Sequence, residues 1–294
     1  MQIALFKYLS ALILFGSNGV VASHIQAESL EIVFFRTTLG AISLLLLVSI
    51  TSKPKSLFQV HHQKGKLALS GVFMGLGWLF LYKAYTLVGV GVASLLYYCG
   101  PILVILISIL QKKEIYTHQI LFGSLMMLVG MILIKPEGVL TGETGKGMLY
   151  GMLSAVMYAC MVLTNRQVKQ VPGLINSLWQ LLASAVVVTL FLFLKKGIAL
   201  PDVQDFWGYI LILGIVNTAL GCYLYFSSIT QLPLRTVAMF GYLEPVSALV
   251  FATLFLDEPF GIPKLVGCTL ILSAAIWTEQ KQQPSSRNTL KKAS

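Results

Sequence analysis

Three ionisable residues lie inside long apolar stretches of this chain, where a charged side chain is costly unless it faces protein or water. They are Arg36, Lys83 and Glu244. Glu244 directly precedes Pro245, whose missing N–H leaves a backbone carbonyl free to face a cavity. We interpret Glu244 either as the polar centre of a site or as the partner of Arg36 or Lys83 in a buried charge pair. Arg36, near the start of its stretch, either faces the substrate or snorkels towards the outer interface, and we expect the latter.

Aromatic residues gather near two prolines. Tyr97 and Tyr98 lie within four residues of Pro101, and Tyr242 lies three residues before Pro245. Aromatic walls beside irregular backbone near the membrane midplane are typical of substrate sites in transporters, although each aromatic residue alone fits packing or interfacial anchoring equally well. We expect Pro101 and Pro245 to act as hinges. The residues expected to contact substrate are Asn18, Trp78, Tyr82, Tyr97, Tyr98, Tyr158, Asn217, Tyr242 and Glu244.

Other kinds of chemistry find little support. The run Gly142–Gly147 resembles a phosphate loop, but it lacks the first glycine and the Ser or Thr that should follow Lys146. The four histidines form no HExxH motif, and no serine lies in a GxSxG motif. We therefore expect no enzymatic activity, no metal and no cofactor. The net charge of +10 comes without an aromatic-rich basic domain, so nucleic acid is not expected as a partner.

Long apolar helices are the elements that must position these residues. The chain has 294 residues, of which 56% are hydrophobic and 11% are charged, a composition that belongs in lipid. Runs of about 20 apolar residues, the length that crosses a bilayer, recur along it. They are too long, and apolar on too many faces, for a membrane barrel. We predict an all-α membrane protein with ten transmembrane helices at about 5–23, 30–50, 67–87, 90–110, 116–134, 147–165, 174–194, 206–228, 236–256 and 260–278.

The chain also contains an internal repeat. Residues 77–131 align with 221–275 at a constant shift of 144, and nine of these 55 positions are identical, among them both prolines. Five apolar spans separate equivalent points, so the second copy is expected to cross the membrane in the opposite direction. We predict a first five-helix repeat at 1–134, a joint at 135–146, a second repeat at 147–278 and a basic cytoplasmic tail at 279–294. The tail is expected to be disordered.

The basic residues sort to one side of the predicted membrane. With the N-terminus inside, 14 of the 21 Lys and Arg residues fall in inner segments and five in outer segments. Because cytoplasmic loops carry an excess of Lys and Arg, we predict that both termini are cytoplasmic.

The chain resembles the EamA type of the drug/metabolite transporter superfamily over nearly its whole length. The resemblance is carried in the first repeat by Phe15-Gly-Ser-Asn18, Arg36, Ala84, Ala93, Pro101, Glu114 and Gly123, and in the second by Leu243-Glu-Pro245, Glu258 and Gly267. Phe15 replaces the usual tryptophan, and Lys83 is an unexpected charge. The resemblance implies ten helices in two inverted repeats, and secondary transport of small metabolites, often amino acids and often outward. It also implies that Glu114 and Glu258 are structural residues at helix ends.

We therefore expect a secondary active transporter that moves an amino acid or related metabolite out across the cytoplasmic membrane by alternating access. Glu244 is expected to carry a coupling proton, with Arg36 or Lys83 stabilising its ionised form. The lipid bilayer and a small-molecule substrate are the expected partners, and the protein is expected to be a monomer or a homodimer. A channel, or a membrane scaffold or receptor without transport activity, is the alternative.

Overall fold

The computed structural model describes residues 2–51, 63–111, 118–133, 142–197, 206–257 and 261–280, and within these ranges it contains helices and no strand. The helices of the first half are α1 (Gln2–Gly16), α2 (Asn18–Ser23), α3 (Ser29–Thr51), α5 (Lys64–Val88), α6 (Val90–Tyr97), α7 (Cys99–Leu110) and α8 (His118–Leu133). Those of the second half are α9 (Gly142–Asn165), α10 (Gly173–Lys196), α11 (Trp207–Leu211), the π-helix η2 (Ile212–Leu220), α12 (Gly221–Ser228), α13 (Leu234–Phe240), α14 (Leu243–Phe255) and α15 (Ile262–Gln280).

Each stretch that the sequence marks as apolar is, in its described part, one helix or consecutive helices. Within the described residues, seven such spans are long and apolar enough to cross a membrane. Two shorter apolar helices occur at Leu243–Phe255 and Leu265–Ala274. Together these spans identify a multi-pass membrane protein.

The last residues of the predicted joint between the repeats are helical. Residues 142–146 form the first turn of α9, so the run that resembles a phosphate loop is helical. The remainder of the predicted joint, Glu114, Glu258 and the tail after Gln280 lie outside the described residues.

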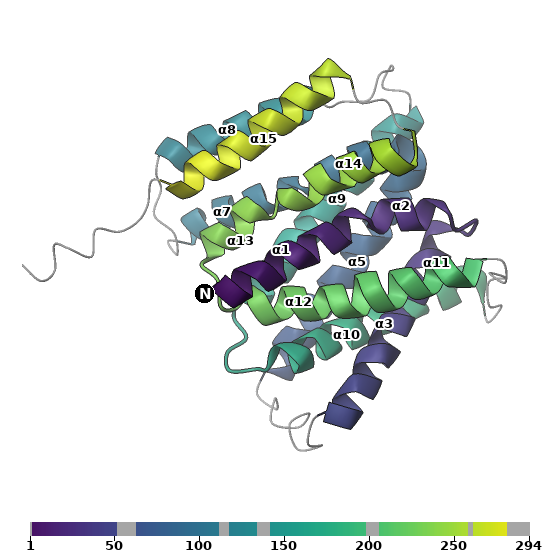
Figure 1. The fold of residues 1–294 in the computed structure, drawn as a ribbon. Helices are drawn as coiled ribbons and strands as arrows, with labels where there is room; N and C mark the ends of the chain where they lie inside the picture. Colours follow the sequence, from purple (N-terminus) through teal and green to yellow (C-terminus); the bar gives the residue numbers. More distant parts are fainter. Residues whose placement is uncertain are drawn as a thin grey trace, which may run out of the picture.

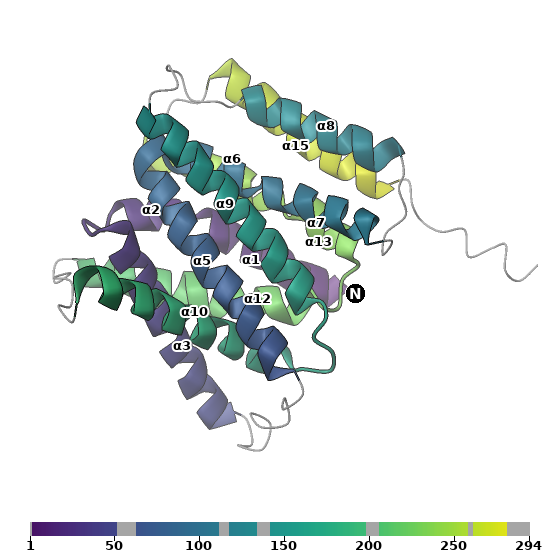
Figure 2. The ribbon, with the colours of Figure 1, turned by 180° about the vertical axis from the view of Figure 1, so that it is seen from behind.

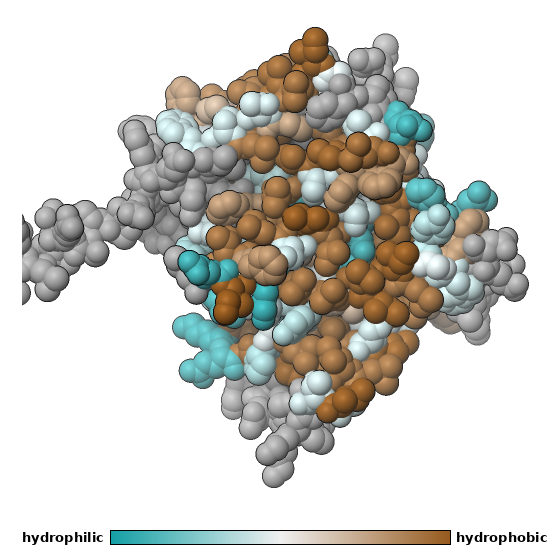
Figure 3. Space-filling model, in the orientation of Figure 1, coloured by the Kyte–Doolittle hydropathy of each residue, from teal (hydrophilic) through white to brown (hydrophobic). Residues whose placement is uncertain are grey.

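The helices run roughly alongside one another, with α8 and α15 side by side along one edge (Figures 1 and 2). α1 and α12 lie next to each other in the middle of the view in Figure 1. On this face hydrophobic residues fill a broad central band, and hydrophilic residues gather towards its left and right edges (Figure 3). This is the surface expected of a bundle that is surrounded by lipid between two aqueous layers.

Small residues bring α5 and α10 into close contact. Gly71 and Gly75 lie one turn apart on α5, and the Oγ of Ser184 donates a hydrogen bond of 2.6 Å to the carbonyl of Gly71. A Cβ at Gly71 would lie 2.5 Å from the carbonyl oxygen of Gln180. This spacing is the GxxxG pattern by which membrane helices approach each other backbone to backbone.

Two of the spans are broken at equivalent points of the repeat. α6 gives way to α7 at Tyr98, and α13 gives way to α14 at Gly241 and Tyr242. Each break lies about three residues before the proline of its repeat, Pro101 or Pro245. A proline cannot donate the backbone hydrogen bond to the carbonyl four residues earlier, so an interruption is expected here. Broken helices of this kind occur at the centres of transporters.

Candidate functional site

A small cavity lies between the broken helices and their neighbours. Its volume is about 30 Å³, enough for one or two water molecules but far below the roughly 300 Å³ or more of a metabolite pocket. The cavity is therefore too small in this structure to hold a metabolite. Five of the residues expected to contact substrate line it together: Asn18, Trp78, Tyr97, Tyr158 and Glu244. The other lining residues are Phe15, Met74, Leu81, Met161, Cys222, Tyr225 and Phe226.

Glu244 is the acidic group of this cavity. It lies in the first turn of α14, where the helix dipole favours a negative charge. No ion pair of the described residues includes its carboxylate. The equivalent position in the first repeat is Gly100, where a Cβ would lie 2.5 Å from Cδ1 of Tyr158. One repeat therefore supplies a carboxyl group, and the other makes room for an aromatic ring.

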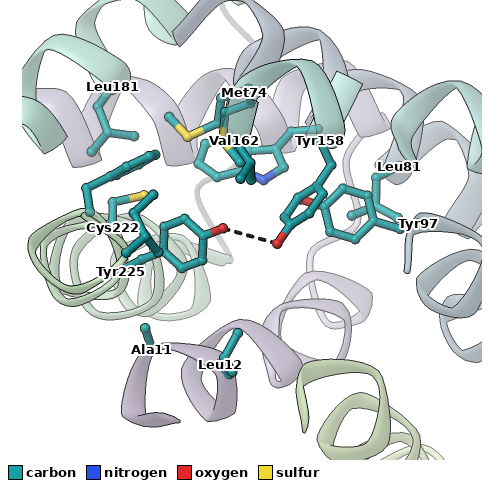
Figure 4. Packing of buried hydrophobic residues seen from close by; sticks show 14 of the residues in the cluster. Ala11, Leu12, Met74, Leu81, Tyr97, Tyr158, Val162, Leu181, Cys222 and Tyr225 are labelled. Atoms are coloured by element: carbon teal, nitrogen blue, oxygen red, sulfur yellow. Dashed lines mark hydrogen bonds between the residues drawn. The ribbon is translucent and has the colours of Figure 1, made fainter. Parts of the chain in front are cut away.

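Tyrosines from different helices meet on the other walls. The hydroxyls of Tyr158 and Tyr225 lie 3.1 Å apart (Figure 4). The ring of Tyr97 lies 5.2 Å from that of Tyr158, nearly perpendicular to it. The ring of Tyr8 lies 5.6 Å from that of Tyr225, tilted by 43°, and its hydroxyl donates a hydrogen bond of 2.6 Å to the carbonyl of Val237. These contacts tie α1, α9, α12 and α13 together beside the cavity.

The π-helix η2 turns two polar side chains inwards. The amide of Asn217 donates to the carbonyl of Leu14 at 3.0 Å, to Oγ of Ser17 at 2.8 Å and to Oδ1 of Asn18 at 3.1 Å. The hydroxyl of Thr218 donates to the carbonyl of Leu213, five residues earlier, at 2.6 Å. π-helical turns are frequent at functional sites. Asn217 does not line the cavity itself but holds Asn18, which does.

The prediction that Arg36 snorkels is wrong, because its side chain is only 1% exposed. Nε donates to Oγ1 of Thr218 at 3.0 Å, and Nη1 donates to the hydroxyl of Tyr82 at 2.5 Å. The guanidinium lies 4.1 Å from the centre of the Trp78 ring. These neutral partners hold the group inside the bundle, so it does not need to reach the interface.

Lys83 does not take part in a buried charge pair. Its side chain is exposed, near the end of α5, and no ion pair of the described residues includes it. α5 extends to Val88, and the position of Lys83 in its last two turns places the ammonium outside the core. Its predicted coupling role therefore has no geometric support.

The remaining predicted site residues lie beside the cavity. Tyr82 binds Arg36, and Tyr98 and Tyr242 are buried at the two helix breaks. Their contact with substrate stays a prediction. Sequence reasoning missed Cys222 and Tyr225, yet the repeat contained a signal for both. At the shift of 144 they are equivalent to Trp78 and Leu81, which also line the cavity.

Comparison with known proteins connects this geometry to a family. The model of the EamA-like transporter family matches residues 2–135 and 145–279, one match for each repeat. A solved crystal structure that is 19% identical in sequence shares the fold, with a TM-score of 0.71 over 94% of this chain and 97% of that chain.

Curated relatives agree with this match. The uncharacterized transporter YxxF of Bacillus subtilis (strain 168) is 23% identical over 95% of this chain and 90% of its own length. An uncharacterized transporter of Helicobacter pylori (strain ATCC 700392 / 26695) is 28% identical over 84% of each chain. The biotin transporter of Escherichia coli (strain K12) is 22% identical over 71% of each chain. The chain, with a match to the family model in both of its halves, belongs to the EamA-like transporter family.

Proposed function

We propose that this protein is a secondary active transporter that moves a small metabolite, an amino acid or a related compound, out across the cytoplasmic membrane by alternating access. In this proposal its ten helices form two inverted repeats, at 1–134 and 147–278, and both termini are cytoplasmic. Rocking at the two proline-associated breaks opens the cavity to one side and then to the other.

The observation that carries the proposal is the pair of broken helices at equivalent positions, with a small cavity between them. A cavity of about 30 Å³ cannot hold a metabolite, so substrate entry requires helices to move apart. Such a requirement fits a carrier better than a channel, whose conducting state is a continuous pore.

Counterflow in proteoliposomes tests the proposal. Vesicles are preloaded with a mixture of amino acids, biotin and small organic acids and amines, and each labelled compound is added outside in turn. Biotin is included because two relatives carry the name of biotin transporters or probable biotin transporters. If the protein is a carrier, its vesicles accumulate more of the labelled substrate than control vesicles without protein do. Absence of exchange for every compound, with protein shown to be folded, would contradict the proposal.

Glu244 is proposed to carry the coupling proton. It is the described acidic residue that lines the cavity, and a carboxyl group that changes its protonation there would link the pH gradient to the conformational change. We expect Glu244→Gln to retain counterflow, which needs no proton movement, but to lose transport driven by a pH gradient. Lys83→Gln serves as the control, because Lys83 is exposed. Unchanged pH-driven transport by Glu244→Gln would show that the carboxyl is structural.

A further inference from the structure

Arg36 is a buried cation whose described partners are all neutral. It contacts the hydroxyls of Thr218 and Tyr82 and the ring of Trp78. Its remaining terminal nitrogen, Nη2, is buried and donates no hydrogen bond within the described part of the chain. Arginine cannot lose its charge by deprotonation in a protein. The group is therefore held in place but not neutralised.

No acidic residue of the described ranges forms an ion pair with Arg36, although the carboxylate of Glu244 interacts with its charge from a longer distance. The ion pairs there join Glu28 and Glu31 to lysines at the end of α10, and Glu143 to Lys146 on α9. Glu244 lines the cavity but forms no ion pair with Arg36. A buried charge without a direct ion-pair partner is unfavourable, whereas a buried pair with good geometry is tolerated. An anion from outside the chain would complete the arrangement.

Two aromatic partners of the guanidinium each line a hollow of the molecule. Trp78, under the guanidinium, lines the central cavity. Tyr82, which accepts its hydrogen bond, lines a second hollow of about 230 Å³, which we call the outer hollow. The outer hollow is bounded by the end of α2, the start of α3, the end of α5 and Val90. Arg36 itself lines neither hollow in this structure, so a neighbouring side chain must move before an anion can reach its guanidinium.

We propose that the transported compound carries an anionic group, a carboxylate or a group of similar shape, and that Arg36 is the residue that binds it. Guanidinium and carboxylate match as parallel pairs of hydrogen bonds, and Trp78 and Thr218 keep the cation oriented until the anion arrives. The rest of the cavity wall is largely aromatic and aliphatic, which fits an apolar body on the same compound. This inference rests on the proposed transport function.

Matched pairs of compounds test it directly. Each pair differs only in whether one group is a carboxylate or a neutral amide: 3-phenylpropionate and its amide, phenylalanine and phenylalaninamide, and biotin and biotinamide. Each compound competes with the label found to be exchanged in the counterflow experiment. We expect the acid to compete at a concentration about tenfold or more below that of its amide, as for a hydrogen bond to a charged group.

Three variants test whether the preference for the acid over the amide comes from Arg36. Arg36→Gln should bring the acid and the amide within about twofold of each other, and Arg36→Lys should retain part of the preference, because the charge stays but the planar fork is lost. Lys83→Gln, which removes an exposed cation from the same bundle, should leave the preference unchanged. If Arg36→Gln does not fold, the role of Arg36 is tested by comparing the acid preference of the wild-type protein with that of Arg36→Lys.

The outcomes separate this inference from the proposed function. Exchange of neutral or cationic compounds alone, equal competition by acid and amide, or a full acid preference in folded Arg36→Gln would each overturn the role of Arg36 while leaving the transporter intact. Absence of exchange for every compound would instead refute the proposed function, and this inference with it.

Discussion

The equivalent residues Gly100 and Glu244 show how one sequence position can take opposite roles in the two repeats. Both lie just after the helix break of their repeat. Gly100 has no side chain and lets the ring of Tyr158 approach its backbone, whereas Glu244 adds a carboxyl group to the same cavity. One polar residue and one aromatic ring therefore meet where two identical side chains would compete for space. The asymmetry gives the cavity a polar side and an apolar side.

The hydrogen bond between Tyr158 and Tyr225 gives a prediction at the same scale. Replacing either tyrosine by phenylalanine leaves the other hydroxyl buried without this partner, at a cost of about 1–3 kcal/mol. We expect Tyr158→Phe and Tyr225→Phe each to lower the Tm in detergent. The double variant should lose less than the sum of the two, with a coupling of about 1 kcal/mol. Tyr209→Phe, on an exposed side chain, is the control. Strict additivity would show that the two hydroxyls do not interact.

At the scale of the elements, hydropathy predicted nearly all of the helix positions, because the thickness of the bilayer fixes how long an apolar run must be. Pro101 and Pro245 likewise marked both helix breaks, since proline chemistry is local. The π-helix at Ile212–Leu220 was not predicted, because its apolar sequence carries no signal that separates i→i+5 from i→i+4 bonding. The burial of Arg36 depends on Trp78, Tyr82 and Thr218, which come from two other spans, and a hydropathy pattern does not show such partners.

The contact between α5 and α10 predicts that replacing two glycines of α5 by alanine will change the stability of the protein by very different amounts. A methyl group at Gly71 would lie 2.7 Å from Cβ of Ala183 as well as close to the backbone of Gln180, so Gly71→Ala must push the helices apart. Overpacking of this kind costs about 1–3 kcal/mol. At Gly65, near the start of α5, a Cβ meets no atom within 4 Å. We expect Gly71→Ala to lower the Tm in detergent and Gly65→Ala to leave it unchanged or raise it slightly. Equal Tm values would contradict this packing.

Ion pairs join the end of α10 to the start of α3. Nζ of Lys196 lies 3.0 Å from Oε1 of Glu28 and also binds Glu31, whereas Lys195 lies 3.9 Å from Glu28. The hydrogen bond from Lys196 holds the pKa of the Glu28 carboxyl below its usual range. A lowered pKa means that this contribution to stability is present at neutral pH and is lost as the pH falls through the pKa of the folded state.

We therefore expect Lys196→Met to lower the Tm at neutral pH by more than the neighbouring change Lys195→Met does. The difference between Lys196→Met and the wild type should shrink below about pH 4, where the carboxylates of both proteins take up protons. Because Glu28 and Lys195 are largely exposed, high salt should also reduce the effect. A difference that is independent of pH would assign the role of Lys196 to packing instead of charge.

At the scale of the whole molecule, helix ends sort into two groups. The end of α10 meets the start of α3 through Lys196 and Glu31, and a Cβ at Gly147, near the start of α9, would touch Leu87 and Val88 at the end of α5. At the opposite end, Gln63 exchanges two hydrogen bonds of 2.6 Å with the backbone of Lys169. The first group, at the end of the bundle with Lys195 and Lys196, contains lysines together with acidic residues that form ion pairs with them. The second holds Lys7, Lys64, Lys66, Arg166 and Lys169.

This distribution predicts which end faces the cytoplasm. An excess of Lys and Arg marks cytoplasmic segments, so the end with Lys169 should be inside and the end with Lys195 outside. In a background without the four native cysteines, Lys195→Cys should react with a membrane-impermeant maleimide in intact cells, whereas Gln167→Cys should react only after permeabilisation. Both positions are exposed at their ends of the bundle, so a difference in labelling reports the side of the membrane and not burial. The reverse pattern would contradict the predicted topology, and it would place both termini outside and the outer hollow beside Arg36 towards the cytoplasm.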